Sequence, residues 1–154
     1  MIHLSKILCP TDYSSTSDNA VRYAVEFARK VGAYVRFVHI ISSANPLEKL
    51  TGSQEGAIVP VEEDDVLPES FSRILMTEKQ KGLNADIRVL KGDAPKVIAQ
   101  QATSWGADLI IMGSHGRSGL HRLIMGSVAE EVFRSSDVPV LLVKQDAVQK
   151  IVSD

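Results

Sequence analysis

The sequence predicts an α/β protein whose strands form an open, doubly wound parallel sheet. Short apolar runs, typical of buried strands, alternate along the chain with longer segments whose apolar residues recur every three or four positions, as in amphipathic helices. Parallel strands need a crossover connection, which a helix of this length supplies. With 154 residues, 44% of them hydrophobic, the chain can form one core. We therefore expect five parallel strands in the order 3-2-1-4-5 and four helices.

The first three predicted elements follow one another closely. Residues 6–10 (KILCP) are a short apolar run and form the first strand. Residues 15–32 carry apolar side chains at helical spacing, with Ser and Asp at the start and Gly32 at the end, which predicts a helix. Residues 33–42 are rich in β-branched and aromatic residues and almost entirely apolar from Phe37 onward, as expected of a strand covered on both faces.

Helix and strand signals alternate again in the second half. Gly82 stands where a helix would stop, Asp93 is placed to cap the next helix, and Pro95 suits its first turn. The predicted elements are a helix over 68–82, a strand over 85–92, a helix over 93–106, a strand over 107–113, a helix over 127–136 and a strand over 138–144. The side chains expected on the inner side of the first of these helices are Phe71, Ile74, Leu75 and Met76.

Residues 43–67 break this alternation. They hold turn-forming glycines and prolines and an acidic run, EEDD. A loop of this length is often a lid or a binding element, but an exposed insertion is the simpler interpretation, which we adopt. We predict a single domain over 1–145 that includes this insertion, followed by a C-terminal tail over 146–154.

Charge and composition exclude several classes of partner. The net charge of -2 provides no positive field for nucleic acid or an anionic membrane, so any anion site must be local. No window approaches the roughly 18 apolar residues that a membrane-spanning helix needs. The single cysteine, Cys9, fits a reducing compartment, and we expect a cytoplasmic protein. Cys9 lies in a predicted buried strand with no activating base nearby, which favours core packing over a nucleophilic role.

The predicted strand order places a ligand site between the first and fourth strands, because such sheets bind ligands at the carboxyl ends of the strands where the order reverses. The segments that follow these strands are PTDYS (10–14) and GSHGRSG (113–119). Glycines at 113, 116 and 126 let the backbone turn sharply or approach a ligand closely. Ser127 stands where the fourth helix would begin, and a helix start presents unpaired N–H groups to an anion.

These features predict an anion site made of backbone and hydroxyl donors from Gly126, Ser127 and Val128. Each hydrogen bond to a charged oxygen contributes about 1.5 to 3 kcal/mol, so a few aligned donors could hold a polyphosphate without net positive charge. The chain has no Walker A loop and no G-x-G-x-x-G after the first strand, so the site is of another kind.

The segment from Gly113 to Ser127, GSHGRSGLHRLIMGS, fits the pattern G-x2-G-x9-G-[ST] and resembles the ATP-binding branch of the universal stress protein family. ILCPTDYS (7–14) and VPVLLVK (138–144) are similar to the family's first and last strands. The resemblance covers nearly the whole chain, is weakest in 43–67, and implies a fold like that of the adenine nucleotide alpha hydrolases.

The resemblance implies that the ligand is ATP, or ADP or AMP, accompanied by Mg²⁺. Asp12 and the backbone of Ile40 would face the adenine and ribose, and Met112 and Gly113 would approach the sugar. The residues that would surround the phosphates are Gly116, Arg117, Gly126, Ser127 and Val128. The implied binding residues are Pro10, Thr11, Asp12, Ile40, Met112, Gly113, His115, Gly116, Arg117, Gly126, Ser127 and Val128. A homodimer through the edge strand Val138–Lys144 is also implied, since that strand is continuously apolar.

Each of these assignments has a simpler alternative. Asp12 could merely cap the first helix, Arg117 could be an ordinary surface cation, and His115 and His121 could be solvated loop residues. The sequence GRSG around Ser118 misses the hydrolase pattern G-x-S-x-G by one residue.

The glycine segment also contains no carboxylate or glutamine that could position water for ATP hydrolysis. We therefore expect no catalytic residues and a nucleotide-dependent regulatory module with at most slow hydrolysis, whose protein partners the sequence does not identify. The alternatives are a slow ATPase and a structural or interaction protein of the same fold that binds no nucleotide.

Overall fold

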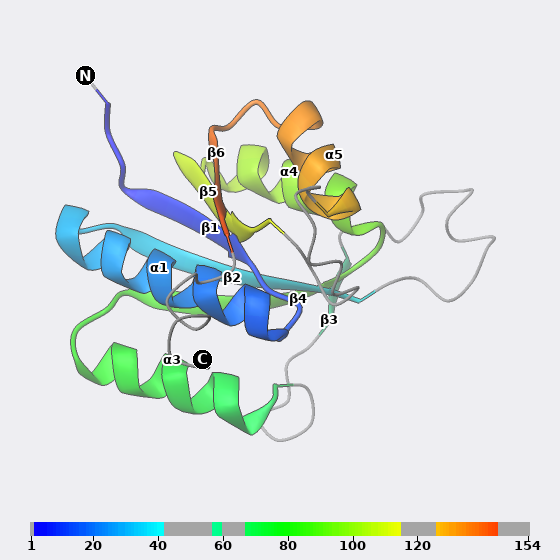
Figure 1. Ribbon diagram of the computed structural model, residues 1–154. Helices are drawn as coiled ribbons and strands as arrows, with labels where there is room; N and C mark the ends of the chain where they lie inside the picture. Colours follow the sequence, from blue (N-terminus) through cyan, green and yellow to red (C-terminus); the bar gives the residue numbers. More distant parts are fainter. Residues whose placement is uncertain (1, 42–56, 60–66, 115–125, 145–154) are drawn as a thin grey trace, which may run out of the picture.

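The computed structural model describes residues 2–41, 57–59, 67–114 and 126–144. Its six strands form one sheet in the order β3-β4-β2-β1-β5-β6, with helices packed on both faces (Figure 1). The elements are β1 (Lys6–Pro10), α1 (Ser15–Val31), β2 (Tyr34–Ile41), β3 (Ala57–Val59), α3 (Glu69–Gln80), β4 (Ala85–Lys91), α4 (Ala94–Trp105), β5 (Leu109–Gly113), α5 (Ser127–Ser135) and β6 (Val140–Val143).

The five parallel strands confirm the predicted order. β4, β2, β1, β5 and β6 are the third, second, first, fourth and fifth predicted strands, and each pairs in parallel with its neighbours. The four helices α1, α3, α4 and α5 of the described residues match the four predicted ones. The order therefore reverses between β1 and β5, where the sequence placed the ligand site.

One strand was missed. β3 lies within the predicted loop 43–67 and pairs antiparallel with β4, with Ile58 opposite Leu90. Three residues are too few to show a strand period, and the free edge of β4 supplies the pairing partner. The prediction of a continuous loop is therefore wrong for Ala57–Val59. Leu67 lies in a bend outside any helix or strand, and 43–56 and 60–66 lie outside the described residues.

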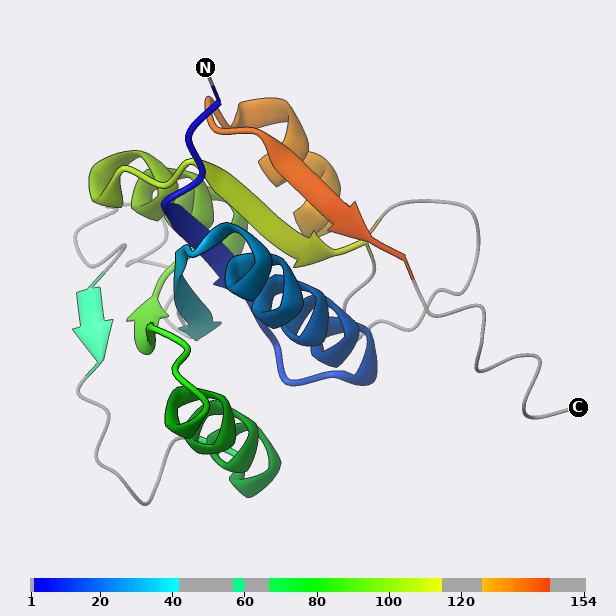
Figure 2. The same ribbon diagram turned by 90° about the vertical axis from the view of Figure 1, so that its left-hand side faces the viewer.

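The helices divide into two layers. α1 and α3 cover one face of the sheet and α4 and α5 cover the other (Figure 2). Side chains alternate between these layers along β1, because Ile7 and Cys9 join the core under α1 while Leu8 joins the core under α4. Cys9 is fully buried, and this burial raises the pKa of its thiol, as suits the predicted packing role.

The helix ends show which local signals are realised. Gly32 ends α1 with a φ of 72°, in the left-handed region that glycine accommodates best. Asp93 stands at the N-cap of α4 but makes no side-chain cap hydrogen bond with a described residue. Met76 is 62% exposed, against the expectation, because it lies five positions after Phe71 and therefore about 140° around the helix from it.

Candidate functional site

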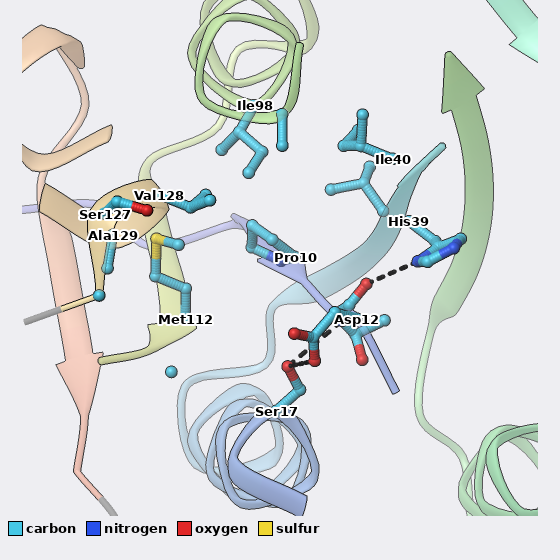
Figure 3. Close-up of a pocket in the computed structure, with 15 residues that line it drawn as sticks. Pro10, Asp12, Ser17, His39, Ile40, Ile98, Met112, Ser127, Val128 and Ala129 are labelled. Atoms are coloured by element: carbon cyan, nitrogen blue, oxygen red, sulfur yellow. Dashed lines mark hydrogen bonds between the residues drawn. The ribbon is translucent and has the colours of Figure 1, made fainter. Parts of the chain in front are cut away.

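A cavity of about 280 Å³ opens at the carboxyl ends of β1, β2 and β5 (Figure 3). It lies between the beginning of α1 on one side and the beginnings of α4 and α5 on the other, at the reversal of strand order. Its size is close to the lower end of the roughly 300–1,000 Å³ found for ligand pockets. The lining residues are Pro10, Thr11, Asp12, Ser17, Val38, His39, Ile40, Ala94, Ile98, Met112, Gly113, Gly126, Ser127, Val128 and Ala129.

The structure brings most of the predicted binding residues together in this cavity. Those that line it are Pro10, Thr11, Asp12, Ile40, Met112, Gly113, Gly126, Ser127 and Val128. The other three predicted binding residues, His115, Gly116 and Arg117, lie outside the described residues, so their roles stay predictions. Residues from three different strands and the start of α5 therefore share one hollow, as the strand order requires.

Several lining residues were not predicted. Ala94 and Ile98 are one helical turn apart at the start of α4. This spacing on the inner side of the helix is the sequence signal that could have predicted their approach to the cavity. Ser17 and His39 could not be found from spacing, because their approach to the cavity depends on the turn after β1. The other unpredicted lining residues are Val38 and Ala129.

Asp12 is held in place by the turn between β1 and α1. Its Oδ1 accepts hydrogen bonds from the backbone N–H of Ser14, at 3.0 Å, and from the Ser17 hydroxyl, at 2.6 Å. The Ser17 hydroxyl oxygen in turn accepts from the Asp12 N–H at 3.2 Å. Burial raises the pKa of the neighbouring Asp18, and the negative charge of Asp12 adds to this effect while Arg22 opposes it.

The helix-capping alternative for Asp12 is wrong in its detail. Ser14 is the N-cap of α1, and its side-chain oxygen accepts from the Ser17 N–H at 3.2 Å. Asp12 instead stabilises the turn before the cap, where Tyr13 adopts a φ of 63°. This turn also places Asp12 in the wall of the cavity.

The opposite wall is the beginning of α5. The N–H of Gly126 donates to the Ser114 carbonyl at 2.6 Å, so it is not available to a ligand. The prediction that this N–H belongs to the anion site is therefore wrong. Gly126 is the N-cap, and its extended conformation directs its N–H outside the helix, toward the segment after β5.

The available donors of α5 therefore begin one residue later than predicted. Glu130 is the first residue whose N–H bonds within the helix, to the Gly126 carbonyl. The N–H groups of Ser127, Val128 and Ala129 precede it, all three residues line the cavity, and no described side chain caps them. These three N–H groups, with the positive end of the helix dipole, are of the kind that bind anions at helix starts in other proteins.

The third wall is the end of β2. The N–H of Thr11 donates to the Val38 carbonyl at 2.9 Å, and β1 has ended at Pro10. In a parallel ladder, alternate residues of a strand bond to the same neighbour, so Ile40 directs its backbone groups to the same side as Val38. Ile40 therefore presents its backbone beyond the end of β1, toward the cavity.

The described residues contain no cluster of three or more His, Cys, Asp or Glu side chains that could hold a metal ion. Within the same residues, no helix is both long enough and apolar enough to span a bilayer.

The fold and the cavity define a class of protein: a doubly wound α/β domain with a ligand cavity at its switch point. The sequence model of the universal stress protein family matches residues 3–144. The chain therefore belongs to the universal stress protein family, as the glycine pattern had indicated.

Individual relatives agree with this assignment. The chain is 32% identical over 146 residues to the universal stress protein A homolog 2 of Coxiella burnetii, covering 94% of this chain and 97% of that protein. The solved structure of MJ0577, a universal stress protein of Methanocaldococcus jannaschii, matches with a TM-score of 0.69 and 28% identity over 95% of this chain and 99% of that one.

Two further solved structures share the fold at lower identity. One is a universal stress protein in complex with cAMP, with a TM-score of 0.61 and 22% identity over 90% of this chain and 95% of that one. The other is the Archaeoglobus fulgidus universal stress protein in complex with dAMP, with a TM-score of 0.60 and 22% identity over 94% of this chain and all of that one.

Proposed function

We propose that this universal stress protein binds an adenine nucleotide, ATP or its products ADP and AMP, in the cavity at the β1/β5 switch point. The observation that carries the proposal is the meeting of an apolar slot, a fixed carboxylate and an open helix start in one cavity. These three features match the base, the ribose and the phosphates of a nucleotide. The complexes of two proteins of this fold with cAMP and dAMP support the same class of ligand.

Each part of the nucleotide would contact a different group of cavity residues with suitable chemistry. Val38, Ile40 and Ile98 provide apolar contacts for the base. Asp12 provides a carboxylate that accepts hydrogen bonds from ribose hydroxyls, and the turn holds this carboxylate before any ligand arrives. Ser127 begins the helix that donates N–H groups to the phosphates.

Mg²⁺ would arrive with the phosphates. The ion offsets the phosphate charge, so it would be bound by phosphate oxygens and would keep several of its waters. The predicted contacts of His115, Gly116 and Arg117 belong to this phosphate end and rest on the family pattern.

The biological role we propose is regulatory. Nucleotide occupancy sets a state of the protein that partner proteins or self-assembly can detect, in the cytoplasm, with hydrolysis that is slow at best. A steady ATPase rate of about one per second in purified protein, abolished by Gly126→Val, would overturn the regulatory assignment in favour of an enzyme; typical enzymes turn over between about 1 and 10³ times per second.

Isothermal titration with ATP, ADP, AMP and cAMP tests the binding proposal. We expect a saturable heat for at least one of these nucleotides, and no heat for any of them contradicts the proposal. Val128→Glu places a carboxylate at the first turn of α5, which the helix dipole tolerates but which repels phosphate, so it should weaken ATP binding at least tenfold. Phe133→Glu is the matched control, because Phe133 is 58% exposed on the same helix and does not line the cavity.

A further inference from the structure

The series of backbone hydrogen bonds between β1 and β2 ends one bond early; each of these bonds is called a rung of the ladder. The N–H of Tyr34 donates to the Ser5 carbonyl at 2.9 Å, which sets the step of this ladder. Counting two residues at a time along both strands, the rung after Val38 would join the Ile40 N–H to the Thr11 carbonyl. The structure has no such hydrogen bond between these two residues.

His39 replaces that rung. Its Nδ1 lies 3.0 Å from the Thr11 carbonyl oxygen. A carbonyl oxygen can only accept, so Nδ1 carries the hydrogen and donates it. The Thr11 carbonyl is thereby bonded to the imidazole of His39. The backbone N–H of Ile40 is left facing the cavity, which Thr11, His39 and Ile40 all line.

Neighbouring side chains hold the imidazole in this position. The ring of Tyr13 lies against it with the ring centroids 4.4 Å apart, and Phe71 of α3 lies behind Tyr13 at 5.4 Å. The N–H of Tyr13 also donates to the Thr11 side-chain oxygen at 3.0 Å, which fixes the residue that carries the carbonyl. The hydrogen bond from His39 to the Thr11 carbonyl is therefore stabilised by the turn after β1 and by the packing of α3.

We propose that His39 is a positioning residue that keeps the Ile40 N–H available to the base of the bound nucleotide. This inference rests on the proposed function and specifies how the base is recognised. Adenine presents a ring-nitrogen acceptor, N1, on its base-pairing edge, whereas guanine carries an N–H at that position. A backbone N–H facing that edge therefore selects adenine over guanine, and His39 maintains the selection through its hydrogen bond to the Thr11 carbonyl.

Amide hydrogen exchange of the ligand-free protein tests the backbone part of this inference. In the wild type, the Ile40 N–H should exchange at least tenfold faster than that of Val38, which lies inside the ladder. His39→Phe retains a ring against Tyr13 but has no donor, so the Ile40 N–H should bond to the Thr11 carbonyl and exchange at least tenfold more slowly. His39→Asn places its Nδ2 donor where Nδ1 stood and should retain the wild-type rate. A slow Ile40 N–H in the wild type, or one that His39→Phe does not slow, overturns the inference.

Nucleotide titration tests the recognition part. His39→Phe should weaken ATP binding about tenfold and remove the preference for ATP over GTP, and His39→Asn should restore both. Equal preference for ATP and GTP in the wild type overturns this part even if the exchange rates agree. Absence of ATP binding by a wild type with the expected exchange rates would instead contradict the proposed function, and the base-recognition role with it, so the two failures are distinguishable.

Discussion

Asp12 shows how a turn can orient a carboxylate before a ligand is present. Two donors from the beginning of α1 reach one of its oxygens, and one of them, the Ser17 hydroxyl, is at only 2.6 Å. Ser17 is 6% exposed, so its hydroxyl has little access to water and depends on Asp12 as its acceptor. The position of the carboxylate is therefore coupled to a residue five positions away.

Ser17→Ala should separate this coupling from the stability of α1. Removal of the hydroxyl leaves Asp12 with one fewer donor, so we expect the affinity for ATP to fall about tenfold and the free energy of unfolding to fall by about 1 kcal/mol. Titration calorimetry and urea denaturation measure the two effects. Ser14→Ala is the control: it removes the N-cap, at about 1 kcal/mol, but keeps the Ser17 hydroxyl bond to Asp12. Equal loss of affinity in both variants would show that Ser17 acts only through the helix.

At the scale of single elements, the beginning of α5 is the part of the site made almost entirely of backbone. The Gly126 N–H is bonded to the Ser114 carbonyl, so Ser127, the first residue of α5, is the first cavity-lining residue of this helix start whose N–H could reach a ligand. Gly126 has a ψ of 152°, the extended conformation that a residue before proline requires. Proline is also well tolerated at the first position of a helix.

Ser127→Pro therefore removes one N–H with little effect on the helix. We expect unchanged thermal stability and a loss of ATP affinity of at least tenfold, because a hydrogen bond to a charged oxygen contributes about 1.5 to 3 kcal/mol. Ser127→Ala retains the N–H and removes only the hydroxyl, so the difference between the two variants measures the backbone contact. Identical ATP affinities for the two variants would mean that this N–H does not bind phosphate.

The opposite end of the sheet has a stabilising role. Arg36 of β2 donates two hydrogen bonds of 2.9 Å to Asp86 of β4, and its guanidinium lies 4.5 Å from the ring centre of Trp105. Burial on its own would raise the pKa of Asp86, but the hydrogen bonds and charge of Arg36, with help from Tyr34 and Arg88, outweigh it and hold this pKa below its ordinary value. Folding is therefore linked to the ionisation of Asp86.

The sign of this linkage determines the pH dependence. A carboxyl group with a lowered pKa stabilises the fold above its unfolded pKa of about 3.9, and this contribution is lost as the pH falls through the folded value. Asp86→Asn should lower the free energy of unfolding by about 2 kcal/mol at pH 7, and the difference from wild type should shrink below about pH 4. Urea denaturation across this range measures it. Glu69→Gln, in the exposed pair with Arg73, should change stability by less than about 1 kcal/mol.

At the scale of the whole molecule, the two edges of the sheet differ. On one side the short antiparallel β3 covers β4, and on the other β6 ends the sheet. Alternate residues of β6 pack on opposite faces, Leu141 and Val143 toward α1 and Val140 and Leu142 toward α5, yet all four are only half-buried. Among the described residues, β6 has one edge without a neighbouring strand. Such an apolar edge suits pairing with a second copy of the chain, and we propose a homodimer through it.

Val140→Lys should disrupt such a dimer, because a charged side chain on an edge strand disfavours pairing with another strand. We expect sedimentation at micromolar concentration to give a dimer for the wild type and a monomer for this variant. Met76→Lys is the control, since Met76 is 62% exposed on α3, which lies away from β6 (Figure 2). A monomeric wild type, or a Val140→Lys variant that remains dimeric, would contradict the proposed interface.

The sequence by itself determined the parallel strand order, the four helices, the family and most of the residues that meet in the cavity. The strand order and the helices follow from the apolar period and the helix-end glycines. The family and the cavity residues follow from a resemblance whose clearest mark is the fixed glycine spacing between Gly113 and Gly126. Tertiary structure alone decided three features: the pairing of β3, the use of the Gly126 N–H by Ser114, and the bond from His39 to the Thr11 carbonyl. The physical reason is that a hydrogen bond between distant segments depends on which partner the fold brings within 3 Å, and no local pattern records that choice.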